Sequence, residues 1–299
     1  MIRIGTRGSE LALWQARRVA QLLHETAGVQ VELVIVHTRG DLDRSRVLHT
    51  LPDTGFFTKE LQRALLDRRV DLVVHSLKDL PIDEPEGLTL AAVLAREATH
   101  DVLVAHPDAL GDGPFGLRAG ARLGTSSLRR AAQVLACQGD VHIVPLRGNV
   151  PTRVERVRQG EVKATLLAGA GLARLQLDLD GVVVRPLPLE VMLPAPGQGA
   201  LAVEARQASA AAAVAGQLDD PAVREATSAE RAVLRGLGGG CHLPLGALAR
   251  RTAAGLTLAA VLGQLDEGLT RATLRRASAC ADSGAEAARQ VLDQLAGAL

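Results

Sequence analysis

Short apolar runs alternate with amphipathic stretches over the first two thirds of the chain. Residues 9–27 place Leu11, Trp14 and Val19 on one face and stop at Gly28, which predicts a helix. Further helices are predicted at 57–69, 128–138, 151–158 and 207–216. Apolar, β-branched runs predict strands at 2–7, 29–38, 70–76, 88–94, 141–146, 164–168, 182–187 and 201–205. This alternation favours a mostly parallel α/β sheet.

The last third of the chain follows a different order. A long helix is predicted at 221–237, and another helix is predicted at 283–299. Between them lie strand-like runs at 245–251, 256–265 and 269–277. Strands grouped between helices in this way favour a small α+β domain.

Two short pieces of the sequence resemble each other. Ile4–Ser9 and Leu123–Ser127 both place Gly-Thr and then Ser between a predicted strand and a predicted helix. The match predicts two related α/β domains, each presenting a helix N-terminus. The Pro- and Gly-rich stretch 193–199, which follows the second of them, suits a hinge.

Composition excludes several classes of function. The 299 residues are 47% hydrophobic and carry a net charge of +1, so no strong field attracts nucleic acid or membranes. Aromatic residues make up only 1%, which argues against base stacking. The three cysteines lie far apart and lack metal-ligand spacing, so neither a disulfide framework nor a metal site is expected. No signal peptide or membrane-spanning run is recognised, and a cytoplasmic protein is expected.

Polar residues gather at the carboxyl ends of predicted strands, where ligands of open α/β sheets bind. Thr125, Ser126 and Ser127 precede a helix whose N–H groups and dipole favour an anion. Arg129 and Arg130 lie in the first turn of that helix, where cations oppose the dipole. Two interpretations of this pair stay open: ligand binding, or solvation on an outer face of the helix.

Arginines also lie at other strand ends. Only three of the 34 Lys and Arg residues are lysines, and a coding bias toward Arg explains most of that excess. Gly148, next to Arg147, permits a close approach to a ligand. A cationic cleft suited to several carboxylates or phosphates is predicted from the arginines at these ends, which are Arg7, Arg129, Arg130, Arg147 and Arg153.

Asp79 is the carboxylate that such a pocket would keep ionised. It follows Lys78 at the end of a predicted strand and could stabilise a developing cation. The alternative is an ordinary turn residue before Pro81. His75, on the same strand, is interpreted as structural.

Cys241 ends a run of three glycines and precedes His242 and Pro244. Glycines free the backbone, so a thiol on this loop is suited to carry a covalent group. The alternative is a free cysteine packed as a small apolar side chain.

Taken in order, these motifs resemble the porphobilinogen deaminase (hydroxymethylbilane synthase) family from end to end. The resemblance is carried by Leu11–Ala16, Thr38–Asp41, Val74–Asp79, Gly124–Arg130, Leu146–Val150, Leu193–Ala200 and Gly239–Pro244. It implies an α/β fold of three domains: two periplasmic-binding-protein-like α/β lobes around a cleft, and a small α+β C-terminal domain. The implied bounds are 1–97 with 198–217 for the first domain, 98–197 for the second, and 218–299 for the third.

The resemblance also implies the reaction and the site. Four porphobilinogen molecules would be deaminated and joined into hydroxymethylbilane on a dipyrromethane cofactor held by a thioether to Cys241. Asp79 would be catalytic, and a cytoplasmic monomer without metal is implied. The acetate and propionate groups would be bound by Arg7, Ser9, Lys78, Thr125, Ser126, Ser127, Arg129, Arg130, Arg147, Gly148 and Arg153, with a further contact from Gln198.

One departure and two rival interpretations remain. Thr54 stands where many relatives carry Lys, so a basic contribution from the loop at 39–58 is in doubt, although Lys59 matches. A two-lobed anionic-solute-binding protein would share the fold but would need neither Cys241 nor Asp79. A phosphate-handling enzyme is disfavoured because no Gly-x-x-x-x-Gly-Lys-Ser/Thr loop is present.

Overall fold

The computed structural model describes residues 1–37, 58–239 and 243–296. Their contacts group into two compact units. Among the described residues, the first unit contains 1–37, 58–97 and 197–225, and the second contains 98–196, 226–239 and 243–296. The chain therefore leaves the first unit after Glu97, returns to it at Gly197 and leaves it again after Glu225. The bounds of three separate domains stay a prediction.

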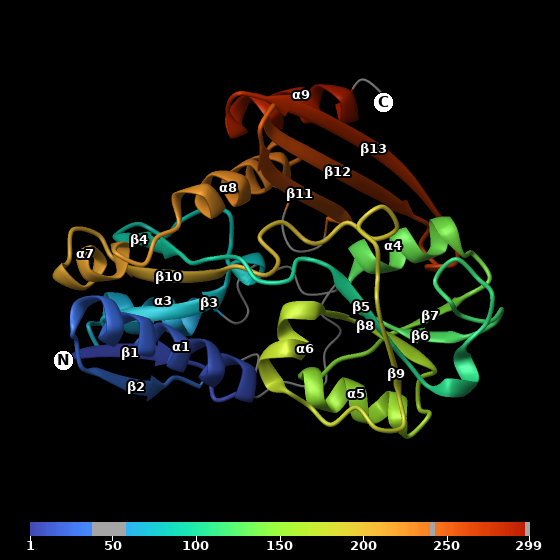
Figure 1. Cartoon of the computed structure of the whole chain (residues 1–299), viewed down its shortest axis with the longest axis horizontal. Helices are drawn as coiled ribbons and strands as arrows, with labels where there is room; N and C mark the ends of the chain where they lie inside the picture. Colours follow the sequence, from blue (N-terminus) through green and yellow to red (C-terminus); the bar gives the residue numbers. More distant parts are fainter. Residues whose placement is uncertain (38–57, 240–242, 297–299) are drawn as a thin grey trace. The chain divides into compact units, whose positions relative to one another are not determined.

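The first unit is built on a five-stranded sheet with the order β2-β1-β3-β10-β4. β1 is parallel to β2 and to β3, whereas β10 is antiparallel to both of its neighbours. One face is covered by the helices α1 and α7, and the other face by α3 (Figure 1). The bounds are β1 Ile2–Thr6, β2 Val31–Ile35, β3 Leu72–Ser76, β4 Leu88–Val93, β10 Leu201–Arg206, α1 Glu10–Ala27, α3 Lys59–Leu66 and α7 Ala210–Gly216.

The second unit begins with a sheet of the same design, in the order β7-β6-β8-β5-β9. Here β5 is antiparallel to β8 and β9, while β6 is parallel to β7 and β8. In each sheet the antiparallel strand stands fourth, and it is the strand that follows a crossing of the chain between units. The bounds are β5 Asp101–Ala105, β6 Arg122–Gly124, β7 His142–Val144, β8 Ala164–Ala168, β9 Val183–Pro186, α4 Leu128–Cys137, α5 Val150–Arg158 and α6 Gly169–Leu175.

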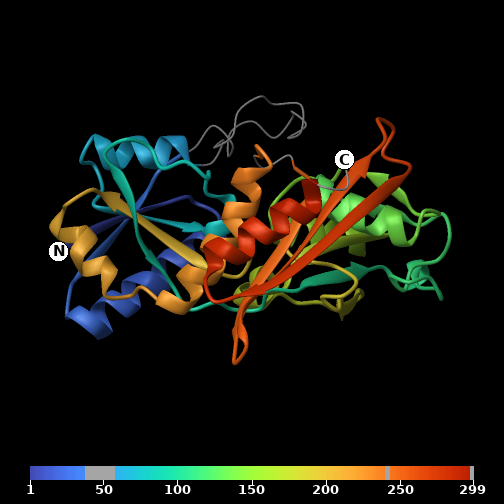
Figure 2. The ribbon, with the colours of Figure 1, turned by 90° about the horizontal axis from the view of Figure 1, so that it is seen from above.

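The C-terminal part of the second unit is a three-stranded antiparallel sheet. Its strands are β11 (Leu245–Thr252), β12 (Gly255–Leu265) and β13 (Ala272–Ala281), and α9 (Gly284–Ala296) lies along them (Figure 2). Apolar residues of α8 (Pro221–Gly236) and α9 fill the core over the sheet. The fold is therefore α/β, with two α/β lobes and a smaller α+β C-terminal domain.

Close packing joins this C-terminal sheet to helix α4. A Cβ atom added at Gly263 on β12 would lie 2.4 Å from the Cβ atom of Ala132 on α4. Only glycine fits at this crossing, because real Cβ atoms do not approach so closely. The sheet and α4 therefore form one packed body within the second unit.

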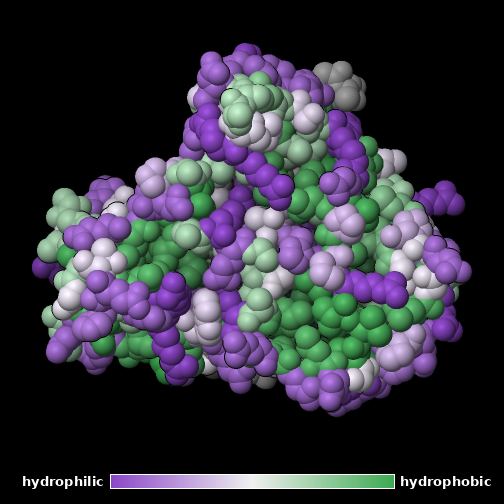
Figure 3. Space-filling view, in the orientation of Figure 1, coloured by the Kyte–Doolittle hydropathy of each residue, from purple (hydrophilic) through white to green (hydrophobic). Residues whose placement is uncertain are grey.

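The outer surface is mixed in polarity. Figure 3 shows an apolar area on the face of the second unit that is turned to the viewer. Leu177, Leu179, Val182 and Val184 are half-buried and pack against a core cluster of this unit. None of the helices in the described part of the chain is long and apolar enough to cross a bilayer. In the same part, no group of three or more His, Cys, Asp or Glu side chains could hold a metal ion.

Candidate functional site

Arg7 and Ser9 lie where β1 passes into α1, in the first unit. Both side chains are half-buried. Ser9 is extended at φ −72° and is the N-cap of α1, and its Oγ accepts a hydrogen bond from the backbone N–H of Ala12 at 3.3 Å. The serine hydroxyl hydrogen stays available to donate while the oxygen caps the helix.

Lys78 and Asp79 lie in a single 3-10 turn, Leu77–Asp79, directly after β3. Leu77 is fully buried and its N–H donates to the carbonyl of Ala200 at 3.0 Å. Asp79 is exposed, and among the described residues its carboxylate has no hydrogen-bond or ion-pair partner. The turn thus presents a carboxylate that no residue in the described ranges neutralises.

The Pro/Gly-rich stretch packs against this turn. Gly197 has φ +75°, and a Cβ atom added there would lie 2.9 Å from Cγ of Leu77. Gln198 is fully buried, and its carbonyl accepts a hydrogen bond from Nε of Arg96 at 2.9 Å. The stretch that the sequence predicts as a hinge therefore supports the Lys78–Asp79 turn within the first unit.

Replacing Gly197 by Ala should lower the free energy of unfolding by more than the roughly 1–2 kcal/mol of a left-handed Ala alone. The additional loss comes from the overlap with Leu77, which cannot move freely in its buried site. The matched control is Gly87→Ala, because Gly87 has φ +80° but its added Cβ would lie at a tolerable 3.4 Å from Leu66. Denaturant titration of both variants measures the difference, and equal losses would contradict the close packing against Leu77.

The loop Thr125–Ser127 lies between β6 and α4 in the second unit. The N–H of Thr125 donates to the carbonyl of Val144 at 2.9 Å, and the hydroxyl of Ser126 donates to the carbonyl of Leu146 at 3.1 Å. The N–H of Ser127 donates to Oγ1 of Thr125 at 3.1 Å. Ser127 is the N-cap residue of α4, but its side chain makes no capping bond. The start of α4 therefore keeps the polarity that favours an anion.

Arg129 and Arg130 are buried and bind the same carboxylate. They are 5% and 6% exposed, so the alternative of two solvated arginines on an outer face is wrong. Nη1 of Arg129 lies 2.6 Å from Oδ2 of Asp101, and Nη2 of Arg130 lies 2.7 Å from Oδ1. Asp101 offsets the unfavourable position of two cations at a helix N-terminus. Their direct contact with a ligand stays a prediction.

Asp101 is the site residue that the sequence reasoning missed. Burial alone would raise its pKa, but the charges and hydrogen bonds of Arg129 and Arg130 outweigh burial and hold the pKa of Asp101 well below its usual value. The available signal was a charged residue opening the apolar run Asp101–Ala105. A buried carboxylate in such a run requires a cationic partner elsewhere in the fold.

Replacing Asp101 by Asn should destabilise the protein at pH 7 by about 3–5 kcal/mol, because two buried guanidinium groups lose their counter-charge. A carboxyl with a depressed pKa stabilises the fold above its unfolded pKa, about 3.9, and this contribution is lost as the pH falls through the folded pKa. Denaturant unfolding of both proteins at several pH values should therefore show the gap shrinking below about pH 4.

The control for this prediction is Glu286→Gln, which breaks an exposed pair with Arg289 on α9. That variant should leave the unfolding midpoint nearly unchanged, since exposed ion pairs contribute little. A gap between wild type and Asp101→Asn that stayed constant down to acid pH would contradict the ionised, buried state of Asp101.

Arg147, Gly148 and Arg153 surround the start of α5. Nη1 of Arg147 is buried and has no hydrogen-bond partner in the described part of the chain. Gly148 has φ +116°, and its carbonyl accepts a hydrogen bond from Nε of Arg153 at 2.8 Å. Asn149 caps α5 through its Oδ1, which accepts from the N–H of Thr152 at 3.0 Å. This corner therefore holds a buried cationic N–H group that an anionic ligand would satisfy.

The predicted residues thus fall into two groups, one in each unit. Arg7, Ser9, Lys78, Asp79 and Gln198 belong to the first unit, and Thr125–Ser127, Arg129, Arg130, Arg147, Gly148 and Arg153 belong to the second. Cys241 and most of the 39–58 loop, including Thr54, lie outside the described residues. Their predicted roles stay predictions.

The fold and these residues define a class: a multidomain α/β protein whose strand-end loops carry cationic and hydroxyl groups for an acidic ligand. Comparison with known proteins narrows the class. Residues 2–213 match the family model "Porphobilinogen deaminase, dipyromethane cofactor binding domain", and residues 225–293 match "Porphobilinogen deaminase, C-terminal domain". The chain belongs to the porphobilinogen deaminase family.

Two named porphobilinogen deaminases agree with this membership. The chain is 43% identical to the probable porphobilinogen deaminase of Methanothermobacter thermautotrophicus over 97% of this chain and 99% of the relative. It is 42% identical to the porphobilinogen deaminase of Roseiflexus castenholzii over 98% of this chain and 96% of the relative. A periplasmic substrate-binding protein of Coxiella burnetii matches at TM-score 0.43 and 14% identity, over 75% of this chain and 94% of that one.

Proposed function

We propose that this chain deaminates four porphobilinogen molecules and joins them head to tail into the linear tetrapyrrole hydroxymethylbilane. The observation that carries the proposal is the match of the two porphobilinogen deaminase family models over residues 2–213 and 225–293. The motifs that carry the resemblance, from Leu11 to Pro244, run through both matched ranges.

The residues described in the structure fit a dipyrromethane cofactor. A dipyrromethane of this family carries acetate and propionate groups, and such groups need guanidinium and hydroxyl donors. The strongest sign of fit is the buried Nη1 atom of Arg147, which has no hydrogen-bond partner among the described residues, because a buried N–H without an acceptor is costly. The cofactor, when bound through Cys241, supplies the primer to which the first substrate ring is joined.

In this proposal the protein binds by charge and hydrogen bonds and stabilises a transient cation. Arg7, Arg147 and Arg153 bind substrate carboxylates, and the loop Thr125–Ser127 adds hydroxyl and backbone donors. Arg129 and Arg130 add positive potential at the start of α4, with Asp101 fixing their position. Lys78 and Gln198 also contribute to binding the cofactor and the substrate.

Asp79 carries the catalytic role. Loss of ammonia from the aminomethyl group of porphobilinogen leaves a positive charge on the ring system, and bond formation then releases a ring proton. A carboxylate without any partner among the described residues is free to stabilise that charge and to accept that proton. Asp79 meets this requirement, since it is exposed at the end of a buried strand.

The proposal is tested on the purified full chain incubated with porphobilinogen. Hydroxymethylbilane should form, and the intact protein should be heavier than its sequence by one dipyrromethane. Ehrlich's aldehyde reagent for pyrroles should colour the native protein. A protein of sequence mass that binds porphobilinogen without converting it would instead be a binding protein, and the proposal would fail.

The remaining expectations concern the state of the protein. We expect a cytoplasmic monomer without affinity for nucleic acid, in keeping with a net charge of +1 and an aromatic content of 1%. Sedimentation of the purified chain measures the oligomeric state directly.

A further inference from the structure

The end of β3 that leads to Asp79 is held by polar side chains on both faces of the sheet. On the face covered by α3, Nε2 of His75 lies 2.8 Å from Oε2 of Glu204 on β10. On the face covered by α1, Nε2 of Gln15 donates to Oγ of Ser76 at 2.8 Å. Successive strand residues point to opposite faces, so these two contacts fix the last two residues of the strand from both sides.

On the face covered by α3, Glu204, His75 and Gln62 form a buried polar network. Glu204 is 1% exposed and His75 is 6% exposed. Gln62 of α3 donates from Nε2 to both carboxylate oxygens of Glu204, at 3.0 and 3.3 Å. The His75 ring nitrogen is close to the Glu204 carboxylate but is not aligned as a hydrogen-bond donor to it, so the two groups are in close polar contact without a formal hydrogen bond. Val73 and Leu61 belong to the apolar core of the same face.

Stability alone does not account for this network. A buried carboxylate and imidazole are costly to desolvate. Apolar side chains of similar volume in their place often give the protein equal or greater stability. His75 is one residue from the last pair of the ladder between β3 and β10, Ser76 and Leu201, and its ring reaches back to Glu204, which stands opposite Val73. Directional side-chain contacts at the end of β3 restrict how far the following turn, Leu77–Asp79, can rotate.

The turn that follows contains Asp79. We propose that Glu204, with Gln62 and His75, is a positioning group that fixes the exit of β3 and thereby the Asp79 carboxylate for turnover. The inference rests on the role proposed for Asp79. A displacement of about 1 Å at a reacting group can lower turnover by about 100-fold, so a modest shift of this strand end matters.

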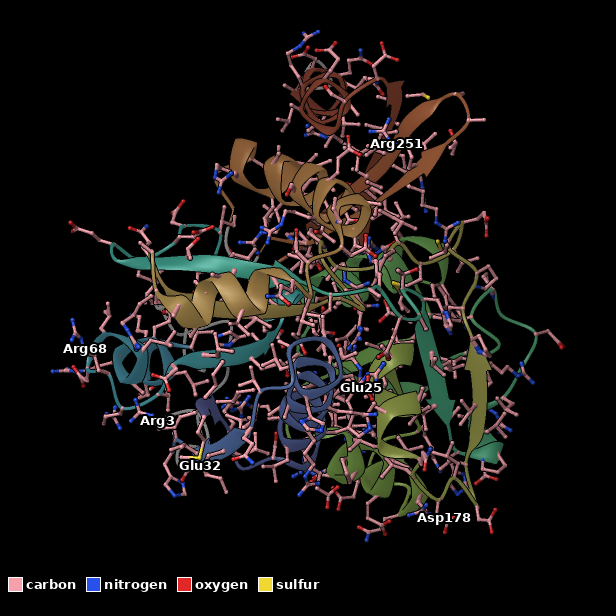
Figure 4. The ribbon with its side chains drawn as sticks, turned by 60° about the vertical axis from the view of Figure 1, so that its left-hand side comes forward. Arg3, Glu25, Glu32, Arg68, Asp178 and Arg251 are labelled. Atoms are coloured by element: carbon pink, nitrogen blue, oxygen red, sulfur yellow. The ribbon has the colours of Figure 1, made fainter. Side chains whose placement is uncertain are left out.

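The test compares Glu204→Gln with a matched variant just before β3, on the side of that strand away from Asp79. Asp71, the residue before β3, binds Arg206 at the end of β10 at 3.2 Å, and it also binds Arg3. Figure 4 shows Arg3 at this edge, near Arg68, whose carbonyl accepts from Nη2 of Arg3 at 2.9 Å. Asp71→Asn therefore removes an ion pair between the same strands, away from Asp79.

Glu204→Gln should lower kcat by about 10- to 100-fold, while KM and the cofactor mass increment stay at wild-type values. Asp71→Asn should lower the melting temperature but leave kcat within about twofold, because its ion pair lies at the far strand end. In an Asp79→Asn background, adding Glu204→Gln should change kcat by less than about twofold, since coupled residues are not additive. A merely structural role would give the same fold-loss in both backgrounds.

A second variant covers the case in which Glu204→Gln does not fold. His75→Leu combined with Glu204→Met fills the site with apolar side chains and should fold, yet kcat should still fall. Wild-type kcat in either folded variant would overturn the inference while leaving the proposed function intact. Wild-type turnover in Asp79→Asn, or no hydroxymethylbilane from the native protein, would instead sink the proposed function.

Discussion

Asp79→Asn should lower kcat by roughly 10²–10³-fold, the usual loss when one preorganised charge-stabilising group is removed. The amide keeps the size of the side chain but cannot balance a developing positive charge or take up a proton. Asp79 is exposed and unpartnered among the described residues, so its replacement breaks no hydrogen bond or ion pair with any of them. The cofactor should remain attached, and the melting temperature should stay close to that of the wild type.

Steady-state rates, intact mass and thermal unfolding of the same preparation separate these effects. Asp67→Asn is the charge-matched control, because Asp67 is an exposed carboxylate of the same unit at the C-terminal end of α3. The control should turn over at the wild-type rate. If Asp79→Asn also kept a kcat within about threefold of wild type, Asp79 would have no part in stabilising the cation.

Elements governed by local patterns were predictable from the sequence. The strand Ala164–Ala168 is found as predicted, and α1 ends at Gly28 in the left-handed conformation that the glycine indicated. The predicted strand at 29–38 is shorter in the structure, where β2 spans Val31–Ile35. Strand ends are set by neighbours in the sheet, which a local pattern does not contain.

The strand β5 was not predicted, and its position explains the omission. It is inserted antiparallel between β8 and β9, so its place depends on pairing with residues far along the chain. Asp101 at its first position also interrupts the apolar pattern that marks a buried strand. The charge is tolerated because Arg129, 28 residues away, lies beside it in the fold.

The same limit applies to the candidate site. The sequence placed Lys78, Asp79 and the Thr125–Ser127 loop at strand ends, because position after an apolar run is a local property. It could not show that Asp101 pairs with both buried arginines, or that Glu204 reaches Gln62, 142 positions away. Buried polar partners are chosen by tertiary structure, and a charged residue within an apolar run is the only local trace of them.

Cys241→Ser should abolish both the dipyrromethane mass increment and hydroxymethylbilane synthesis. A thiolate is a far stronger nucleophile than a serine hydroxyl, so the dipyrromethane should not become attached to serine. Cys241 stands after Gly238–Gly240 within the range that matches the C-terminal family model, and its proposed role is based on this position. Without the primer the first substrate ring has no acceptor, and turnover should be lost rather than slowed.

The other cysteines provide matched controls within the same chain. Cys137 and Cys280 are free and exposed, so a pyrrole could become attached to either thiol adventitiously. The double variant Cys137→Ser/Cys280→Ser should keep the full mass increment, the Ehrlich colour and wild-type turnover, because it retains Cys241. An increment that persisted in Cys241→Ser, or disappeared in the double variant, would place the attachment on another sulfur. Peptide mapping of the native protein would then identify which thiol carries the pyrroles.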